Sequence, residues 1–217
     1  MTTDVINNYL SIQENIKKIQ ITKKVNIIAV SKTFNMDRIA PLISYGHLHF
    51  GENKLQEALT KWSETKKNHN KIKLHMIGKL QSNKAKKAVE LFDYIHSLDN
   101  EKLAKVLSKS EQSLNKKINY FIQVNVGQEV QKSGIPYNLV DQFYDYCSKE
   151  LNLNILGLMA IPPADDNEDK HFKLLNETNT SLGLNELSMG MSSDYQIALK
   201  HKATFLRIGS AIFGNRS

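Results

Sequence analysis

Short apolar runs alternate along the chain with longer segments whose apolar residues recur at helical spacing. The opening segment, roughly residues 3–20, repeats apolar residues every three or four positions and predicts an amphipathic helix. The first apolar run, residues 26–32 (NIIAVSK), is followed by a predicted helix over residues 36–46. Asn35 is suited to cap the start of that helix, and Gly46 is suited to end it.

The same order of apolar run and helical segment repeats about eight times. The later runs are HLHFGEN (47–53), KIKLHMIG (71–78), DYIHSLD (93–99), NYFIQVNV (119–126), NILGLMAI (154–161), ELSMG (186–190) and FLRIG (205–209). Alternating strands and helices predict parallel strands with crossover helices, and continuous apolar runs are typical of strands buried on both faces. Eight such units predict a single (β/α)8 TIM barrel domain over residues 1–217, with an extra N-terminal helix. An open doubly wound sheet remains the alternative, because periodicity does not reveal closure.

Composition restricts the class of protein further. The 217 residues are 41% hydrophobic and 24% charged, which is ordinary for a globular protein. No apolar run approaches the ~20 residues that cross a bilayer, and the N-terminal segment does not resemble a signal peptide, so we expect no membrane association. Cys147, the lone cysteine, cannot form an intramolecular disulfide. We therefore expect a cytoplasmic protein, and we expect a monomer.

The formal net charge of +7 raises the question of nucleic acid binding. The positive charge is nearly all lysine in scattered pairs, and no aromatic-basic string is present, so we expect no nucleic acid partner. The histidines show no metal-binding spacing with carboxylates at strand ends, so we expect no metal site. His75 is a candidate for the barrel mouth or for the core, and His49 lies at a strand start, the wrong end for catalysis.

Lys32 ends the first apolar run, where a parallel barrel carries its functional groups. A lysine beside an apolar core has a lowered pKa, which makes its amine a nucleophile suited to forming an imine with an aldehyde. An exposed lysine just beyond the strand, or one paired with Glu52, remains an open alternative.

Anion-binding candidates follow the last two apolar runs. Ser192 or Ser193 is placed to cap a helix with Asp194 in its first turn, and Gly209 and Ser210 begin the final turn. Unpaired amides at such starts bind anions, and barrels often bind phosphate with the loops after strands 7 and 8. For the serine pair, an ordinary helix cap is the alternative.

Arg207 and Gly209 point to the same side of the last strand by alternation, toward the barrel interior or mouth. A buried arginine needs an acceptor, such as a pyridine nitrogen, a carboxylate or Glu52. Met159, Met189 and Met191 are assigned to packing, with the alternative that one lies against a flat ring.

Seven blocks in this order resemble one known family, the pyridoxal-phosphate homeostasis proteins of the YggS/PROSC type, which bind pyridoxal 5'-phosphate (PLP). The blocks are AVSKT (29–33), FGEN (50–53), HMIGKLQSNK (75–84), NVGQEVQKSGI (125–135), GLMAIPP (157–163), LSMGMSSD (187–194) and RIGSAIFG (207–214). Two positions depart from the family pattern. Phe34 stands where the family is often basic, and Lys54 stands where it often has tyrosine.

The resemblance implies a barrel like the N-terminal domain of alanine racemase, with PLP held as a Schiff base on one lysine. The implied cofactor contacts are Lys32 for the Schiff base, Ser192, Gly209 and Ser210 for the phosphate, Arg207 for the pyridine nitrogen, and Asn53 and Met189 for the ring.

These residues favour a carrier over an enzyme. PLP is a strong electron sink when its ring nitrogen is protonated, and an arginine facing that nitrogen neither gives up nor accepts the proton. Alanine racemase, which is similar here, brings a second base from an additional β domain, and we expect none after residue 217. We therefore expect a protein of intracellular PLP homeostasis without robust catalysis, which passes PLP to apo-enzymes. A PLP-dependent racemase or decarboxylase of the same barrel type is the alternative, and an RNA-binding basic protein is a distant third.

Overall fold

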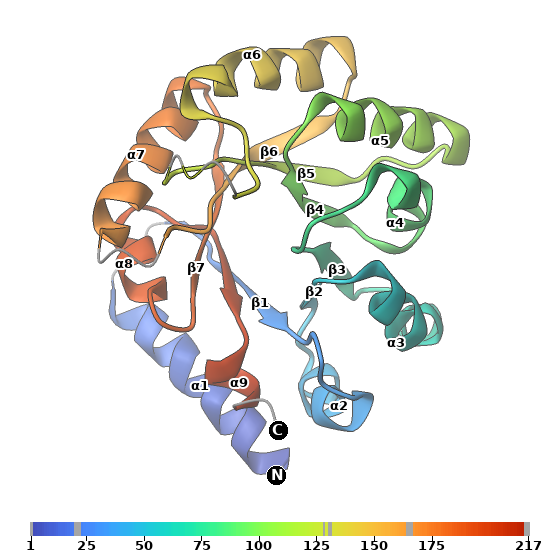
Figure 1. Ribbon diagram of the computed structural model, residues 1–217. Helices are drawn as coiled ribbons and strands as arrows, with labels where there is room; N and C mark the ends of the chain where they lie inside the picture. The colour runs from blue at the N-terminus through green and yellow to red at the C-terminus, as the bar shows by residue number, and fades with distance from the viewer. Residues whose placement is uncertain (1, 20–22, 128, 130–131, 164–166, 215–217) are drawn as a thin grey trace.

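Eight parallel strands form a closed barrel in the computed structural model, which describes residues 2–19, 23–127, 129, 132–163 and 167–214 (Figure 1). The strands are β1 (Asn26–Val30), β2 (His49–Glu52), β3 (Lys73–Met76), β4 (Tyr94–Leu98), β5 (Asn119–Gln123), β6 (Asn154–Met159), β7 (Glu186–Met191) and β8 (Phe205–Ile208). Each strand pairs with the next, and β8 returns to β1 with Ile28 opposite Arg207. The closed barrel is confirmed, and the open sheet is wrong.

Helices surround the barrel and connect its strands (Figure 1). The α-helices are α1 (Thr2–Lys18), α2 (Met36–Tyr45), α3 (Leu55–Asn68), α4 (Ala85–Leu91), α5 (Glu101–Leu114), α6 (Val140–Asp145), α7 (Glu168–Ser181), α8 (Tyr195–Lys200) and α9 (Ser210–Phe213). The expected N-terminal helix is α1, which packs against α2 and α9. The predicted ends of α2 are confirmed, because the Asn35 side chain accepts from the Arg38 amide and Gly46 adopts φ 94°.

The apolar core has two parts. The larger part lies between the strands and the helices, and it includes Trp62 of α3 and Phe172 of α7, both fully buried. The smaller part fills the barrel interior with Ile28, Phe121 and Phe205. Burial of apolar side chains stabilises the fold by about 25 cal/mol per Å², so the larger outer layer contributes most of this stabilisation.

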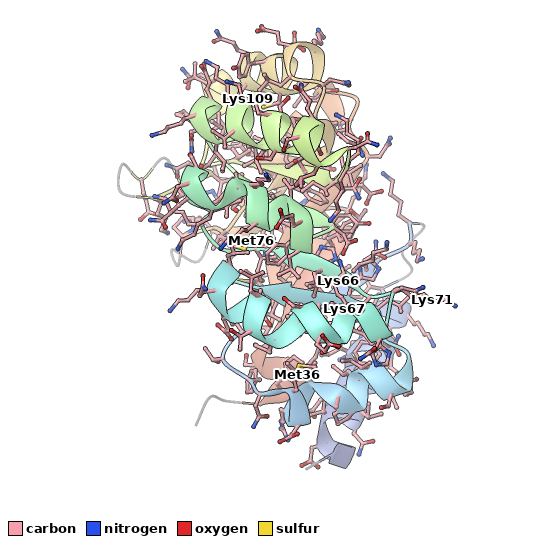
Figure 2. The ribbon with its side chains drawn as sticks, turned by 90° about the vertical axis from the view of Figure 1, so that its right-hand side faces the viewer. Met36, Lys66, Lys67, Lys71, Met76 and Lys109 are labelled. Atoms are coloured by element: carbon pink, nitrogen blue, oxygen red, sulfur yellow. The ribbon has the colours of Figure 1, made fainter. Side chains whose placement is uncertain are left out.

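Lysines occupy the outward faces of the helices. Figure 2 labels Lys67 on α3 and Lys109 on α5, and both are exposed. Lys67 pairs there with Glu64 at 3.1 Å, an exposed contact of little energetic weight. Within the described ranges, no helix is long and apolar enough to cross a membrane.

Candidate functional site

A cavity of about 520 Å³ opens at the carboxyl ends of the strands, within the range typical of small-molecule sites. It gathers all the predicted site residues except Met189. Its described lining is Val30, Lys32, Phe34, Asn53, Ile77, Ile161, Met191, Ser192, Ser193, Arg207, Gly209, Ser210 and Gly214.

Met189 does not line this cavity, so the structure does not support its predicted role at the ring. Ser188 points into the barrel, where it bonds to Arg207, and alternation then turns Met189 outward into the fully buried outer core. The register of β7 against β8 shifts between Ser188 and Met191, and Gly190 adopts φ 90° within this stretch. This irregularity brings Met191 to the cavity instead.

The turn that carries Lys32 is held by a hydrogen bond from Ser31, the preceding residue, to the buried Glu52 carboxylate. The Glu52 Oε1 atom accepts from Ser31 Oγ at 2.7 Å, from Lys61 Nζ at 2.9 Å and from Trp62 Nε1 at 3.0 Å. Lys61 Nζ also donates to the Ser31 carbonyl at 2.8 Å. The buried carboxylate is thus paired with Lys61, a residue that the sequence did not single out.

The next residue after Lys32 is also held in place. Thr33 adopts φ 69°, an uncommon conformation for a β-branched residue, and its amide donates to the Glu57 carboxylate. Burial raises the pKa of Glu57, but hydrogen bonds from Lys61 and Thr33 outweigh that effect and lower it overall. The ionised Glu57 therefore fixes the turn on the side of α3.

Arg207 is nearly fully buried at the cavity floor. Its Nη1 donates to the carbonyl and hydroxyl of Ser188 at 2.6 and 2.8 Å, and its Nη2 donates to the Ala160 carbonyl at 2.8 Å. The alternative that it pairs with Glu52 is wrong. Burial lowers the pKa of Arg207 to about 10, opposed by Asp194, so the guanidinium stays charged at neutral pH.

Ser192 bridges the loop after β7 to the final turn. Its Oγ accepts from the Gly209 amide at 3.3 Å and from the Ala211 amide at 3.2 Å. The prediction that Ser192 or Ser193 caps the next helix is wrong, because α8 begins at Tyr195 and Asp194 occupies its cap position. The serine hydroxyl instead satisfies amides at the start of α9.

Phe34, noted as a departure from the family pattern, lines the cavity and packs against Phe213 with ring centroids 5.0 Å apart. Ile77 and Ile161 add apolar wall that the sequence did not indicate as functional. The position of Phe34 therefore contributes a flat apolar surface to the mouth of the barrel.

The donor set of the cavity suits a flat anionic ligand with an electrophilic carbon. Lys32, Arg207 and the hydroxyls of Ser192 and Ser210 offer positive charge and hydrogen-bond donors, while the described lining contains no carboxylate. A phosphate is favoured by such donors, and an aldehyde is the natural partner of an amine. PLP carries both groups, so the residues present fit it.

Fold and cavity together define a barrel of the alanine racemase type. Residues 8–217 match the family described as alanine racemase, N-terminal domain. Alanine racemase from Clostridium difficile shares this fold, with a TM-score of 0.75 at 13% identity, over 99% of this chain and 57% of that one.

Closer relatives narrow the family. The pyridoxal phosphate homeostasis protein of Pseudomonas aeruginosa is 39% identical over 197 residues, 88% of this chain and 85% of its own length. The protein of that name from Vibrio cholerae is 36% identical over 228 residues, 95% and 97% of the two chains. The present chain belongs to the pyridoxal phosphate homeostasis proteins.

A solved member shows the cofactor in this fold. PipY from Synechococcus elongatus, with PLP bound, superimposes with a TM-score of 0.86 at 33% identity, over 97% of this chain and 100% of that one. The family resemblance expected from the seven sequence blocks is thus confirmed.

Proposed function

We propose that this chain binds PLP as a reversible Schiff base on Lys32, within one barrel domain, and serves PLP homeostasis without robust catalysis. The observation that carries the proposal is one cavity that brings the Lys32 side chain together with Arg207, Ser192 and Ser210. The PLP-bound structure of PipY and the names of the relatives support it.

Each lining residue has a defined task in this proposal. The ε-amine of Lys32 bonds to the aldehyde carbon of PLP with loss of water. Ser192, Gly209 and Ser210 hold the phosphate, and Arg207 donates to the pyridine nitrogen. Asn53 contacts the ring, and so does Met191, which takes the place expected for Met189.

Two features of the lining support a carrier over a racemase. PLP supplies an electron sink when its ring nitrogen is protonated, and the charged Arg207 offers that nitrogen a hydrogen bond without a proton to transfer. Racemisation also needs an acid and a base on opposite faces of the substrate. Among the described lining residues, the amine of Lys32 is the group that can act as a base, because Arg207 keeps its proton, so a second base is missing from them.

The cellular role follows from reversible binding. We propose that the protein limits free PLP and delivers it to apo-enzymes that depend on PLP, acting as a monomer without nucleic acid or membrane. The lone described cysteine, Cys147, is buried, and burial raises its pKa to about 12, which leaves it unreactive. A reducing cytoplasm is the location we propose.

Absorbance tests the assignment directly. Purified protein incubated with PLP should absorb in the visible-violet region, and Lys32→Ala should lose this band. Lys54→Ala is the matched control, because Lys54 is exposed and lies outside the cavity lining. Borohydride reduction followed by peptide mapping should place the label on Lys32. A band that persists in Lys32→Ala, or its absence from the parent protein, contradicts the proposal.

A racemase or decarboxylase of the same barrel type is the second candidate, favoured by the match to the alanine racemase N-terminal domain. Incubation of the PLP-loaded protein with single amino-acid enantiomers in deuterated water separates the two. Exchange of the α-hydrogen, or loss of the carboxyl group, at enzymatic rates would establish the enzyme and overturn the carrier.

A further inference from the structure

A chain of hydrogen-bonded side chains runs through the barrel interior and ends at Arg207. His49 Nδ1 lies 2.9 Å from His75 Nε2, and His75 Nδ1 lies 2.8 Å from His96 Nε2. His96 Nδ1 lies 2.8 Å from Ser188 Oγ, which accepts from Arg207 at 2.8 Å. We call His49, His75, His96 and Ser188 the histidine relay. It crosses from β2, β3 and β4 to β7 (Figure 1).

The rings of the histidine relay are held by aromatic neighbours as well as by hydrogen bonds. His75 stacks on Tyr94 with centroids 4.2 Å apart and an interplanar angle of 11°. His96 stacks on Phe121 at 4.4 Å and 15°. Both imidazoles are fully buried, so of the two places expected for His75, the barrel mouth and the core, the core is correct. Stacking fixes the ring planes, and the hydrogen bonds then fix the rotation within each plane.

His75 and His96 are bonded at both ring nitrogens, so each must donate at one nitrogen and accept at the other. Burial lowers the pKa values of His75 and His96 well below the ordinary 6.5, so both rings are neutral at pH 7. A neutral imidazole carries one N–H and one acceptor nitrogen. Only two directions of donation along the relay satisfy this requirement. Reversing the direction moves the proton of both His75 and His96 to the other ring nitrogen.

Arg207 selects between the two directions. It can only donate, so Ser188 Oγ accepts from it, and the serine hydrogen then needs its own acceptor. Across the described residues, His96 Nδ1 is the other partner of that hydroxyl. Ser188 therefore donates to His96, and the protons of His96 and His75 sit on Nε2. The opposite direction leaves the serine hydrogen unpaired in a fully buried site, which is unfavourable.

We propose that His96, acting through Ser188, is a positioning residue for Arg207, and that His75 and His49 hold His96 in the required tautomer. The task of the histidine relay is to keep Ser188 Oγ an acceptor. Arg207 Nη1 is then committed to Ser188, and its Nε–H and one Nη2–H, which have no partner among the described residues, remain for a ligand in the cavity. This inference rests on the proposed PLP site and adds to it the residues that orient its arginine.

The tautomers can be measured without PLP, on the full chain. Nitrogen-15 NMR of histidine-labelled apo-protein at pH 7 should show His75 and His96 protonated at Nε2 and bare at Nδ1. Ser188→Ala should shift His96 toward a mixture of tautomers. A proton found on Nδ1 of His96 in the parent protein would overturn the proposal. Because the tautomers are measured without PLP, a failure of this inference is distinguished from a failure of the proposed PLP-binding function.

Binding measurements test the positioning role. His96→Phe and Ser188→Ala should each weaken PLP binding about tenfold, the scale of one buried hydrogen bond to a charged group. They should also change the absorbance spectrum of bound PLP. The double variant should lose no more than either single variant, because both act through one hydroxyl. His69→Gln, at an exposed position, is the control.

A packing role predicts a different outcome. Each variant would then lower the melting temperature and leave the affinity and spectrum unchanged, and the two losses in stability would add. That result would overturn the positioning role. If His96→Phe fails to fold, the tautomers of the parent protein still decide the proposal.

Discussion

Lowering the pH should unfold this protein through its buried histidines. His75 and His96 are fully buried, and desolvation holds their pKa values well below the ordinary 6.5. His47 is also buried, and desolvation lowers its pKa to about 4. In the unfolded chain each of these rings titrates near 6.5, so the unfolded state binds more protons as the pH falls below that value. Stability is thus fully present above pH 6.5 and is lost below it.

The size of the effect follows from linkage. A histidine that stays neutral when folded and titrates at 6.5 when unfolded costs about 2 kcal/mol of stability at pH 5. His47, His75 and His96 together therefore remove about 6 kcal/mol. His49, whose pKa desolvation also lowers to about 4, contributes in the same direction. A domain is typically stable by only about 5–15 kcal/mol, so the loss is a large part of the total.

Urea denaturation at a series of pH values measures this loss. The free energy of unfolding should fall by about 4 kcal/mol per pH unit around pH 5, the slope for three protons taken up on unfolding. His96→Phe should reduce the slope by about one proton, and His69→Gln, at an exposed position, should leave it unchanged. A slope of less than one proton between pH 6 and 5 would refute the assignment of neutral buried histidines.

Two further predictions concern the supports of the cavity. Lys61→Met leaves the buried Glu52 carboxylate without its cation, so the free energy of unfolding in urea denaturation should fall by about 3–5 kcal/mol. Lys67→Met, which removes an exposed ion pair, is the control and should change it by less than about 0.5 kcal/mol. Ser192→Ala removes the acceptor of two amides at the start of the final turn and should lower the free energy of unfolding by about 1 kcal/mol. Inorganic phosphate should also compete less well with PLP for binding to this variant. Ser181→Ala, on the exposed end of a helix, should leave that competition unchanged. Unaltered stability in Lys61→Met, or unaltered phosphate competition in Ser192→Ala, would contradict these roles.

The repeated apolar runs predict the parallel strands and their crossover helices, because strands buried on both faces leave a clear pattern in the sequence. Closure into a barrel rested on the number of units and not on the pattern of any one of them. The strand-end positions of Lys32 and Asn53 followed from the same pattern. So did the shared orientation of Arg207 and Gly209, since alternation along β8 is regular and both residues line the cavity. These predictions needed only local periodicity and the rule that parallel strands end on one face.

Two predictions depended on more than local periodicity. The family resemblance implied Met189 at the ring, but Met189 packs in the outer core, as its assignment to packing expected, and the shifted register of β7 brings Met191 to the cavity. Ser192 was expected to cap a helix, but its hydroxyl is taken by amides that lie 17 and 19 residues further along the chain. A strand irregularity and a contact between successive loops depend on tertiary packing, and neither has a short-range signal.

The histidine relay is the clearest case of a structure that no local pattern indicates. His49, His75 and His96 stand on three different strands, and the bond from His96 to Ser188 spans 92 residues. A polar interior of this kind is tolerable because most apolar burial lies outside the barrel, between strands and helices. Three uncharged imidazoles nevertheless contribute less apolar burial than the branched aliphatic side chains that usually fill such barrels. A polar chain whose two buried imidazoles are paired at both nitrogens, and which ends on the cavity arginine, is therefore better explained by the orientation of that arginine than by stability.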